Sequence, residues 1–323
     1  MATRTRLWRN GRLDKQDFPA TEISDYLAQD DTVVWLDLCA PTDLSIISDE
    51  LGLDPLAIED ALSVHERAKL DRYPGYLFLN VYSAQLDAAS GALTTYEISA
   101  FVTQRALVTV RPTAGFDVDE LVERWNSQSD LARHGVAFLL HSLIDLVVDQ
   151  HFAAVQALDN EIEGLEDLLF DENGVGDQTV QRRSYELRKS LVLLRRVVLP
   201  MREVVNTVLR RDLPFVPDAM TPYFQDVYDH ALRAAEWTDS LRDLVTTLLE
   251  TRIAIQGNRL NQVMKKLTGW AAIIALPTAV TGFYGQNVPY PGADQHWGFL
   301  VSTTLWLVGG LTLYVVFKRK DWL

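Results

Sequence analysis

The longest uncharged stretches of the chain lie in its last sixty residues. No charged residue occurs from Leu267 to Ala293, and none occurs from Gln295 to Phe317. Segments of about 20 apolar residues within these stretches are long enough to cross a hydrocarbon core of roughly 30 Å as helices. The pattern therefore predicts two transmembrane helices, residues 267–285 and 298–317, joined by a short outer loop, residues 286–297.

Basic residues flank both predicted spans. Lys265 and Lys266 precede the first span, Lys318–Lys320 follow the second, and the loop contains no Lys or Arg. The positive-inside rule then predicts that both ends of the hairpin are cytosolic. The basic clusters, with Trp297 and Trp322 at the expected interfaces, argue against a helical hairpin buried in a soluble core. No apolar run follows the first arginines of the chain, so no signal peptide is expected. We expect a multi-pass protein of the inner or plasma membrane with both termini in the cytosol.

The first third of the chain has the pattern of an α/β layer. Thr42 is expected to cap a short helix within it. Segments rich in β-branched and aromatic residues predict four strands: Thr32–Leu38, Tyr76–Ser83, Leu93–Val102 and Ala106–Val110.

Long helices follow this layer from about Val136. The last of them has helical periodicity from Tyr223 to near Tyr284 and would extend roughly 90 Å. The predicted fold class is therefore an α+β membrane protein, in which a long helix continues from the cytosolic part into the first span. The division we expect is a cytosolic α/β domain with long helices (1–222), a stalk helix (223–266), the first span (267–285), the outer loop (286–297), the second span (298–317) and a basic cytosolic tail (318–323).

Composition excludes several functions. The formal charge is −14, which argues against nucleic-acid binding; the acidity suits either a domain that meets cations or a merely soluble one. Cys39 is the only cysteine, so an internal disulfide is excluded. No phosphate-binding loop and no metalloprotease or hydrolase motif occurs, so we expect neither an enzyme nor a cofactor. His141 and His151 are expected to be partly buried or surface residues rather than zinc ligands.

The first predicted span carries a stripe of small or weakly polar residues. Spacings of three and four place them on one helical face. Such a stripe has two interpretations, close helix packing or a water-filled passage surrounded by several copies of the chain. The residues of this stripe are Thr268, Ala271, Ala275, Thr278, Gly282 and Gly285.

Several motifs together resemble the CorA family of divalent-cation channels. They are "AIEDALSVHERAKL", "HSLIDLVVDQHF", "PYFQDVYDHALRAAE", "NQVMKKLT", "GFYGQN" and the final "KRKDWL", which occur in the expected order along nearly the whole chain. The resemblance implies a homopentamer with an α/β funnel domain, a long stalk helix and an inner ring of first spans.

The resemblance assigns the outer mouth of a pore to Gly285, Gln286 and Asn287, where the family has Gly-Met-Asn. A ring of Asn287 carboxamides would offer oxygen dipoles to a hydrated cation. Gln286 departs from the family's methionine and leaves the choice of ion open.

Further residues are assigned by the same resemblance. Met264 and Leu267 would form an apolar constriction that gates by dewetting, although ordinary helix packing also explains them. The pore-facing set is Glu250, Asn261, Met264, Leu267, Ala275 and Thr278. The regulatory divalent-cation set is Asp60 and Asp226, between neighbouring subunits, with Glu59, Asp145 and His230 at a nearby second site.

The function expected from these features is divalent-cation transport, with Mg²⁺, or Co²⁺ or Ni²⁺, as substrate and a divalent cation as regulatory ligand. The expected partners are further copies of the chain, metal cations and the lipid bilayer, with no nucleic acid. A zinc transporter of the same fold, coupled to protons, is the alternative. A membrane-anchored signalling or scaffold protein is the alternative from another class.

Overall fold

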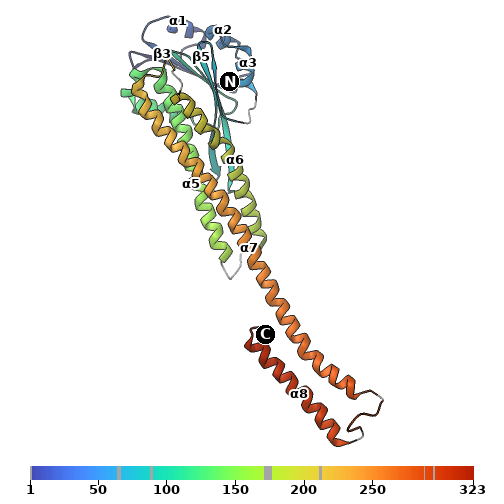
Figure 1. The fold of residues 1–323 in the computed structure, drawn as a ribbon. Helices are drawn as coiled ribbons and strands as arrows, with labels where there is room; N and C mark the ends of the chain where they lie inside the picture. The colour runs from blue at the N-terminus through green and yellow to red at the C-terminus, as the bar shows by residue number, and fades with distance from the viewer. Residues whose placement is uncertain are drawn as a thin grey trace. The chain divides into compact units, whose positions relative to one another are not determined.

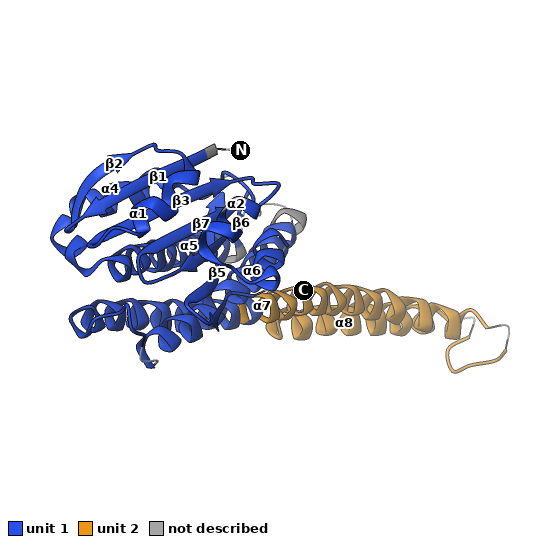
Figure 2. Cartoon of the chain, turned by 90° about the horizontal axis from the view of Figure 1, so that it is seen from above, with its two compact units in different colours: residues 1–246 blue, residues 247–323 orange. Residues whose placement is uncertain are grey.

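The structure, a computed structural model, describes residues 2–63, 67–87, 90–170, 177–210, 213–286, 288–293 and 295–323. The chain divides into two compact units, Met1–Thr246 and Thr247–Leu323 (Figure 2). Helix α7, Thr221–Tyr284, runs without a break and contributes to both units.

The first unit contains seven strands and most of the helices in the described part of the chain. The strands are β1 (Ala2–Arg9), β2 (Arg12–Gln16), β3 (Thr32–Cys39), β4 (Lys69–Tyr73), β5 (Tyr76–Asp87), β6 (Ala92–Val102) and β7 (Ala106–Arg111). The α-helices are α1 (Ile23–Leu27), α2 (Ser45–Leu51), α3 (Pro55–Leu62), α4 (Val118–Ser127), α5 (Val136–Phe170), α6 (Asp177–Arg210) and the start of α7, with short 3-10 turns at Ala20–Glu22, Ser129–His134 and Asp218–Met220.

The strands form one sheet in the order β2-β1-β3-β7-β6-β5-β4. Neighbouring strands are antiparallel except for β3 and β7, which are parallel at the centre. A parallel pair requires a long crossover connection, and the segment between β3 and β7 contains α2, α3 and the β4–β6 meander.

Helices cover both faces of this sheet (Figure 1). On one face, Ile23 of α1, Ile47 of α2 and Ala57 of α3 share a buried cluster with Val34 and Leu36 of β3. Successive strand residues point to opposite faces. Figure 1 shows α5 and α6 on the other side of the sheet.

Trp35 marks the second face. It lies between Val34 and Leu36 in β3 and packs edge-on against Trp125 of α4, with ring centroids 4.8 Å apart. Its indole N–H donates to the hydroxyl of Thr109, 3.1 Å away.

A buried ion pair lies beside this tryptophan. The Arg111 guanidinium donates to both carboxylate oxygens of Asp37, at 2.9 and 2.6 Å, and the Thr109 hydroxyl donates to the same carboxylate at 2.7 Å. Arg111 also donates to the Phe116 carbonyl at 3.1 Å. Asp37 is almost fully buried, so its charge is matched within the protein rather than by water.

The first part of α7 packs on the long helices of this unit. Phe152 of α5 meets Trp237 of α7 with ring centroids 5.2 Å apart, and Arg195 of α6 pairs with Asp239 of α7 at 2.6 Å. Phe224 is fully buried at the start of α7.

Three helices among the described residues are long and apolar enough to cross a membrane, and they differ in burial. The apolar window of α5 is 72% buried, whereas those of α7 and α8, His296–Arg319, are 11% and 0% buried. The apolarity of α5 is therefore explained by packing within the first unit, and that of the other two helices is not.

The second unit is a helical hairpin formed by the end of α7 and α8. Glycines bring the two helices together: a Cβ at Gly269 of α7 would lie 3.2 Å from Leu323 and 3.7 Å from Phe317, and a Cβ at Gly309 of α8 would lie 2.6 Å from Leu276. Small residues at such contacts allow backbones to approach closely.

The four predicted strands are confirmed as β3, β5, β6 and β7, and so is the long helix that continues into the apolar segment. The expectation that Thr42 caps the helix α2 is wrong, because the Asp43 carboxylate accepts from the backbone N–H of Ser45 at 2.9 Å and from its hydroxyl at 2.6 Å. His141 and His151 are fully buried, not partly exposed. The division of the chain into a cytosolic domain, stalk, spans, loop and tail stays a prediction.

Candidate functional site

The small-residue stripe of α7 faces away from α8. The contact with α8 is marked on α7 by Gly269 and Leu276, and Val280 is buried on the same face. At about 100° per residue, the centre of the stripe lies about 150° around the helix from this face. All six residues of the stripe are exposed in the chain, and a Cβ at Gly282 would meet nothing within 4 Å. Packing within the hairpin therefore does not explain the stripe.

Two threonine hydroxyls on or beside the stripe donate their protons within the helix. Thr278 donates to the Ile274 carbonyl at 3.0 Å, and Thr281 donates to the Pro277 carbonyl at 2.9 Å. A hydroxyl oxygen keeps acceptor capacity after donating. The exposed Thr278 oxygen can therefore accept a hydrogen bond from an ion's hydration shell.

The other residues assigned to a pore are exposed as well. Met264 is 50% and Leu267 63% exposed, and Glu250, Asn261 and Ala275 are also exposed. Large apolar side chains such as Met264 and Leu267, exposed along a helix, indicate that another surface covers them, either lipid or another chain. Whether these residues line a pore stays a prediction.

The C-terminal end of α7 closes in a turn. The Gly285 N–H donates to the Thr281 carbonyl at 2.8 Å, and the Gln286 N–H donates to the Phe283 carbonyl at 3.3 Å. A Cβ at Gly285 would lie only 3.0 Å from the Thr281 oxygen, so a glycine fits this turn without strain. Asn287, the third residue of the predicted mouth, lies outside the described residues.

An aromatic contact ties the following loop to this turn. The rings of Tyr284 and Tyr290 meet edge-on with centroids 5.1 Å apart. They line a pocket of about 550 Å³ between the end of α7, the loop and α8. Among the described residues, its lining offers hydroxyl and amide oxygens from Thr281, Gln295, Ser302 and Thr303, together with the imidazole of His296.

Of the predicted regulatory residues, Asp60 lies on α3 and is paired within its own chain. Lys69 of β4 donates to the Asp60 carboxylate at 2.6 Å and lies 2.9 Å from the Asp71 carboxylate. Burial lowers the pKa of Lys69, but the hydrogen bonds to Asp60 and Asp71 outweigh it and raise the pKa above its ordinary value. Glu59, next to Asp60, is exposed.

Asp145 of α5 belongs to a separate group of charges. Arg124 of α4 donates to Asp145 and to Asp149, at 2.6 Å each. Burial raises the pKa of the Asp145 carboxyl, and Asp149 raises it further, whereas Arg124 and the nearby His230 oppose the rise. The structure thus brings Asp145 and His230 into one neighbourhood.

Asp226 lies one turn before His230 on α7 and is exposed. It acts electrostatically on His141, whose pKa is lowered to about 4, mainly by burial. The rings of Tyr223 and Phe224 pack edge-on against His141, with centroids 5.7 and 5.4 Å away.

The predicted metal ligands therefore fall into two groups. Asp60 and Glu59 lie on α3, over one face of the sheet, and Asp145, Asp226 and His230 lie on helices of the other side (Figure 1). Within the described ranges of a single chain, no three His, Cys, Asp or Glu side chains gather as metal ligands would.

Sequence reasoning missed Lys69 and Arg124, the partners of two predicted ligands. Lys69 lies in the "AIEDALSVHERAKL" motif together with Asp60, and this shared motif was the one sign in the sequence that the two residues could be partners. No such sign was present for Arg124, because its partners Asp145 and Asp149 lie on α5, more than twenty residues away along the chain.

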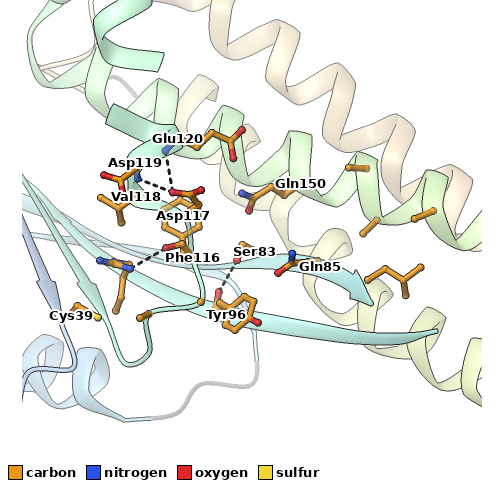
Figure 3. Close-up of a pocket in the computed structure, with 18 of the residues that line it drawn as sticks. Cys39, Ser83, Gln85, Tyr96, Phe116, Asp117, Val118, Asp119, Glu120 and Gln150 are labelled. Atoms are coloured by element: carbon orange, nitrogen blue, oxygen red, sulfur yellow. Dashed lines mark hydrogen bonds between the residues drawn. The ribbon is translucent and has the colours of Figure 1, made fainter. Parts of the chain in front are cut away.

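A second pocket, of about 740 Å³, opens in the first unit between β5, β6, the start of α4 and α5 (Figure 3). Its charged groups are already engaged: Asp117 accepts from the backbone N–H groups of Asp119 and Glu120, and Asp119 pairs with Arg4. Arg111 is held by Asp37 and by the Phe116 carbonyl. The described residues that line this pocket therefore offer no convergent set of charges for a metal ion.

Known proteins match this chain over most of its length. The sequence profile of the family described as "CorA-like Mg2+ transporter protein" matches residues 30–319. The Cobalt/magnesium transport protein CorA of Thermotoga maritima is 31% identical over 315 residues, covering 95% of this chain and 89% of that protein. The Zinc transport protein ZntB of Pectobacterium carotovorum is 24% identical over 280 residues, covering 84% of this chain and 82% of that protein.

The fold has a solved counterpart. The complete structure of the CorA magnesium transporter from Methanocaldococcus jannaschii superimposes with a TM-score of 0.80 at 21% identity, covering 100% of this chain and 99% of that chain. The profile spans most of the chain, and the Thermotoga relative exceeds 30% identity over nearly its full length. The chain therefore belongs to the CorA-like Mg²⁺ transporter family.

Proposed function

We propose that the chain transports divalent metal cations, Mg²⁺ first among them, through a homopentameric pore lined by the small-residue face of α7. One observation carries the proposal: this face is exposed, carries no charge and lies away from α8. A lipid-facing helix does not require small and hydroxyl-bearing residues there, because lipid tails are best met by bulky apolar side chains.

The exposed face requires several copies of the chain. A two-helix hairpin cannot enclose a passage, whereas a ring of identical α7 helices around a symmetry axis can. The count of five is what the resemblance to the family implies. The exposed Met264 and Leu267 side chains would then meet their copies and form the apolar constriction.

The outer mouth favours a hydrated, oxygen-seeking ion. Mg²⁺ gives up its water reluctantly and prefers oxygen, and the pocket beside the mouth offers neutral hydroxyl and amide oxygens. Zinc prefers nitrogen and sulfur ligands, and His296 is the only imidazole among the described residues that line that pocket. We place Mg²⁺, with Co²⁺ or Ni²⁺, ahead of zinc on this ground. The membrane potential would drive entry.

We further propose that cytosolic divalent cations regulate the pore between subunits. The carboxylates of Asp60 and Asp226 suit Mg²⁺ chemically, and they lie on opposite sides of the sheet of one chain. Within one chain they therefore do not lie together, and a pair across an interface of two chains is what the resemblance to the family implies. A bound cation would turn carboxylate repulsion into attraction and stabilise the closed state, and its loss would release that state.

The orientation follows from the basic residues. Lys265 and Lys266 on α7 and Lys318–Lys320 after the second span favour cytosolic ends in the inner or plasma membrane. The acidic first unit would then lie on the cytosolic side.

Ion uptake into proteoliposomes tests the proposal. We expect potential-driven entry of Mg²⁺ that is lost in Asn287→Ala and kept in the control Asn126→Ala, whose side chain lies in the first unit. Zn²⁺ entry that follows a proton gradient, with little Mg²⁺ flux, would instead support the zinc transporter that the ZntB relatives make the second candidate. If a well-folded protein carried no metal ion, the membrane-anchored signalling or scaffold protein would be the remaining hypothesis.

A further inference from the structure

The side chain of Lys69 lies between two carboxylates of its own chain. Its ammonium nitrogen is 2.6 Å from an Asp60 oxygen and 2.9 Å from an Asp71 oxygen. These carboxylates come from different elements, Asp60 from α3 and Asp71 from β4. A single positive charge therefore stands where two negative charges converge.

The position of this ammonium is well defined. Lys69 is paired with Asn80 in the β4–β5 ladder, which fixes its backbone. Its ammonium lies 5.4 Å from the centroid of the Phe78 ring, a favourable distance for a cation over an aromatic face. The side chains of Lys69 and Asp60 are each about one-third exposed, at 32% and 33%. Solvent, and ions from it, can therefore reach the pair.

A divalent cation at Asp60 would meet this ammonium. Two cations that share one carboxylate repel each other, and the carboxylate oxygen can give only part of its charge to each. Binding of the divalent ion at Asp60 therefore has to displace the Lys69 ammonium or bear its repulsion. Either requirement weakens metal binding.

We propose that Lys69 is a tethered counter-cation that competes with the divalent ion for Asp60 and so sets the cation concentration at which the inter-subunit site fills. This inference rests on the proposed regulatory role of Asp60 and Asp226. In the absence of metal, the Lys69 ammonium offsets part of the negative charge of Asp60, which limits carboxylate repulsion between subunits. At sufficient metal concentration, the divalent ion replaces that internal partner.

Neutral substitutions at Lys69 test the competition. The measured quantity is the Mg²⁺ concentration at the midpoint of a titration of the regulatory site. In Lys69→Gln and Lys69→Met this midpoint should fall at least about fivefold. Lys69→Met also retains the aliphatic stem beside Phe78. Lys69→Arg keeps the charge and should stay within about twofold of the wild type. Lys15→Gln removes an equal charge that is paired with Glu22 and Tyr26 elsewhere in the first unit, and should leave the midpoint unchanged.

The midpoint is best measured as protection of the purified full-length protein from chymotrypsin across a Mg²⁺ titration. Chymotrypsin does not cleave at lysine, so the substitutions do not remove a cleavage site. Asp60→Asn and Asp226→Asn should abolish the Mg²⁺-dependent protection.

Three results would overturn the inference. An unchanged midpoint in the Lys69 variants, or an equal shift in Lys15→Gln, would overturn the competition while leaving the regulatory site intact. Protection that ignores Mg²⁺ in the wild type would overturn both the regulatory site and the competition.

Discussion

Gly309 of α8 lies directly against Leu276 of α7. A Cβ at position 309 would be 2.6 Å from a methyl carbon of Leu276, whereas a Cβ at the neighbouring Gly310 would meet nothing within 4 Å. The two glycines are adjacent in sequence and differ in the surface they meet. They therefore form a matched pair for testing how the hairpin is held together.

Gly309→Val should destabilise the hairpin by about 1–3 kcal/mol, because the added methyl groups force the two helices apart or push Leu276 from its rotamer. Gly310→Val should be close to wild type in the same measurement. Thermal unfolding of the detergent-solubilised protein, followed by tryptophan fluorescence, checks both. Equal loss in the two variants would mean that the contact between Gly309 and Leu276 does not hold the helices together.

Arg111 is expected to be the costliest single charge to remove from the first unit. Arg111→Met leaves the Asp37 carboxylate buried without its partner, which should cost about 3–5 kcal/mol. Arg4→Met, which breaks the more exposed pair with Asp119, should cost less than about 1 kcal/mol. Urea unfolding of the full chain measures both losses. Arg111→Met combined with Asp37→Asn should cost less than the sum of the single changes, since the orphaned charge is then gone.

His151 is expected to make the first unit sensitive to acid. Burial lowers the pKa of His151 to about 4, and its Nε2 lies 2.6 Å from the Tyr82 carbonyl. Because a carbonyl only accepts, Nε2–H is the donor in the neutral ring.

The sign of the effect follows from proton binding. Between about pH 6.5 and 4, the unfolded histidine binds a proton that the folded one does not, so stability falls as the pH falls. This residue therefore lowers the free energy of unfolding by about 3 kcal/mol near pH 4, and it has no such effect above about pH 7. Unfolding free energies measured from pH 7 to 4 should therefore show a shallower decline in His151→Gln than in the wild type. Parallel declines would contradict the assignment.

Several elements could be predicted because their signals are local. Strands β3, β5, β6 and β7 are buried and rich in β-branched and aromatic residues, and α7 has unbroken helical periodicity. Strands β2 and β4 have the sequences RLDKQ and KLDRY, and β2 is exposed throughout. Such edge strands obtain their hydrogen bonds from a neighbouring strand rather than from their own composition, so they were missed.

The candidate site shows the same division. The small-residue stripe could be read from spacing, since helical periodicity alone places Ala275 and Thr278 on one face. Which face meets α8 depends on the contacts of Gly269 and Gly309, and these join segments far apart in the sequence. The pairing of Lys69 with Asp60 likewise depends on where β4 enters the sheet.

The central claim is that the small-residue face of α7 meets water in the assembled transporter. It is tested by introducing single cysteines into a Cys39→Ser background, since Cys39 is the only cysteine of the chain. Ala275→Cys and Thr278→Cys place a thiol on this face, and Leu305→Cys places one on the exposed apolar surface of α8.

The measurement is the reaction of these thiols with a charged, membrane-impermeant methanethiosulfonate in proteoliposomes that take up Mg²⁺. The account predicts that the thiols at positions 275 and 278 react and that uptake falls as they do, while the thiol at position 305 stays unmodified in lipid. The account would be contradicted if the thiols at positions 275 and 278 stayed as unreactive as the thiol at position 305 while the protein continued to take up Mg²⁺.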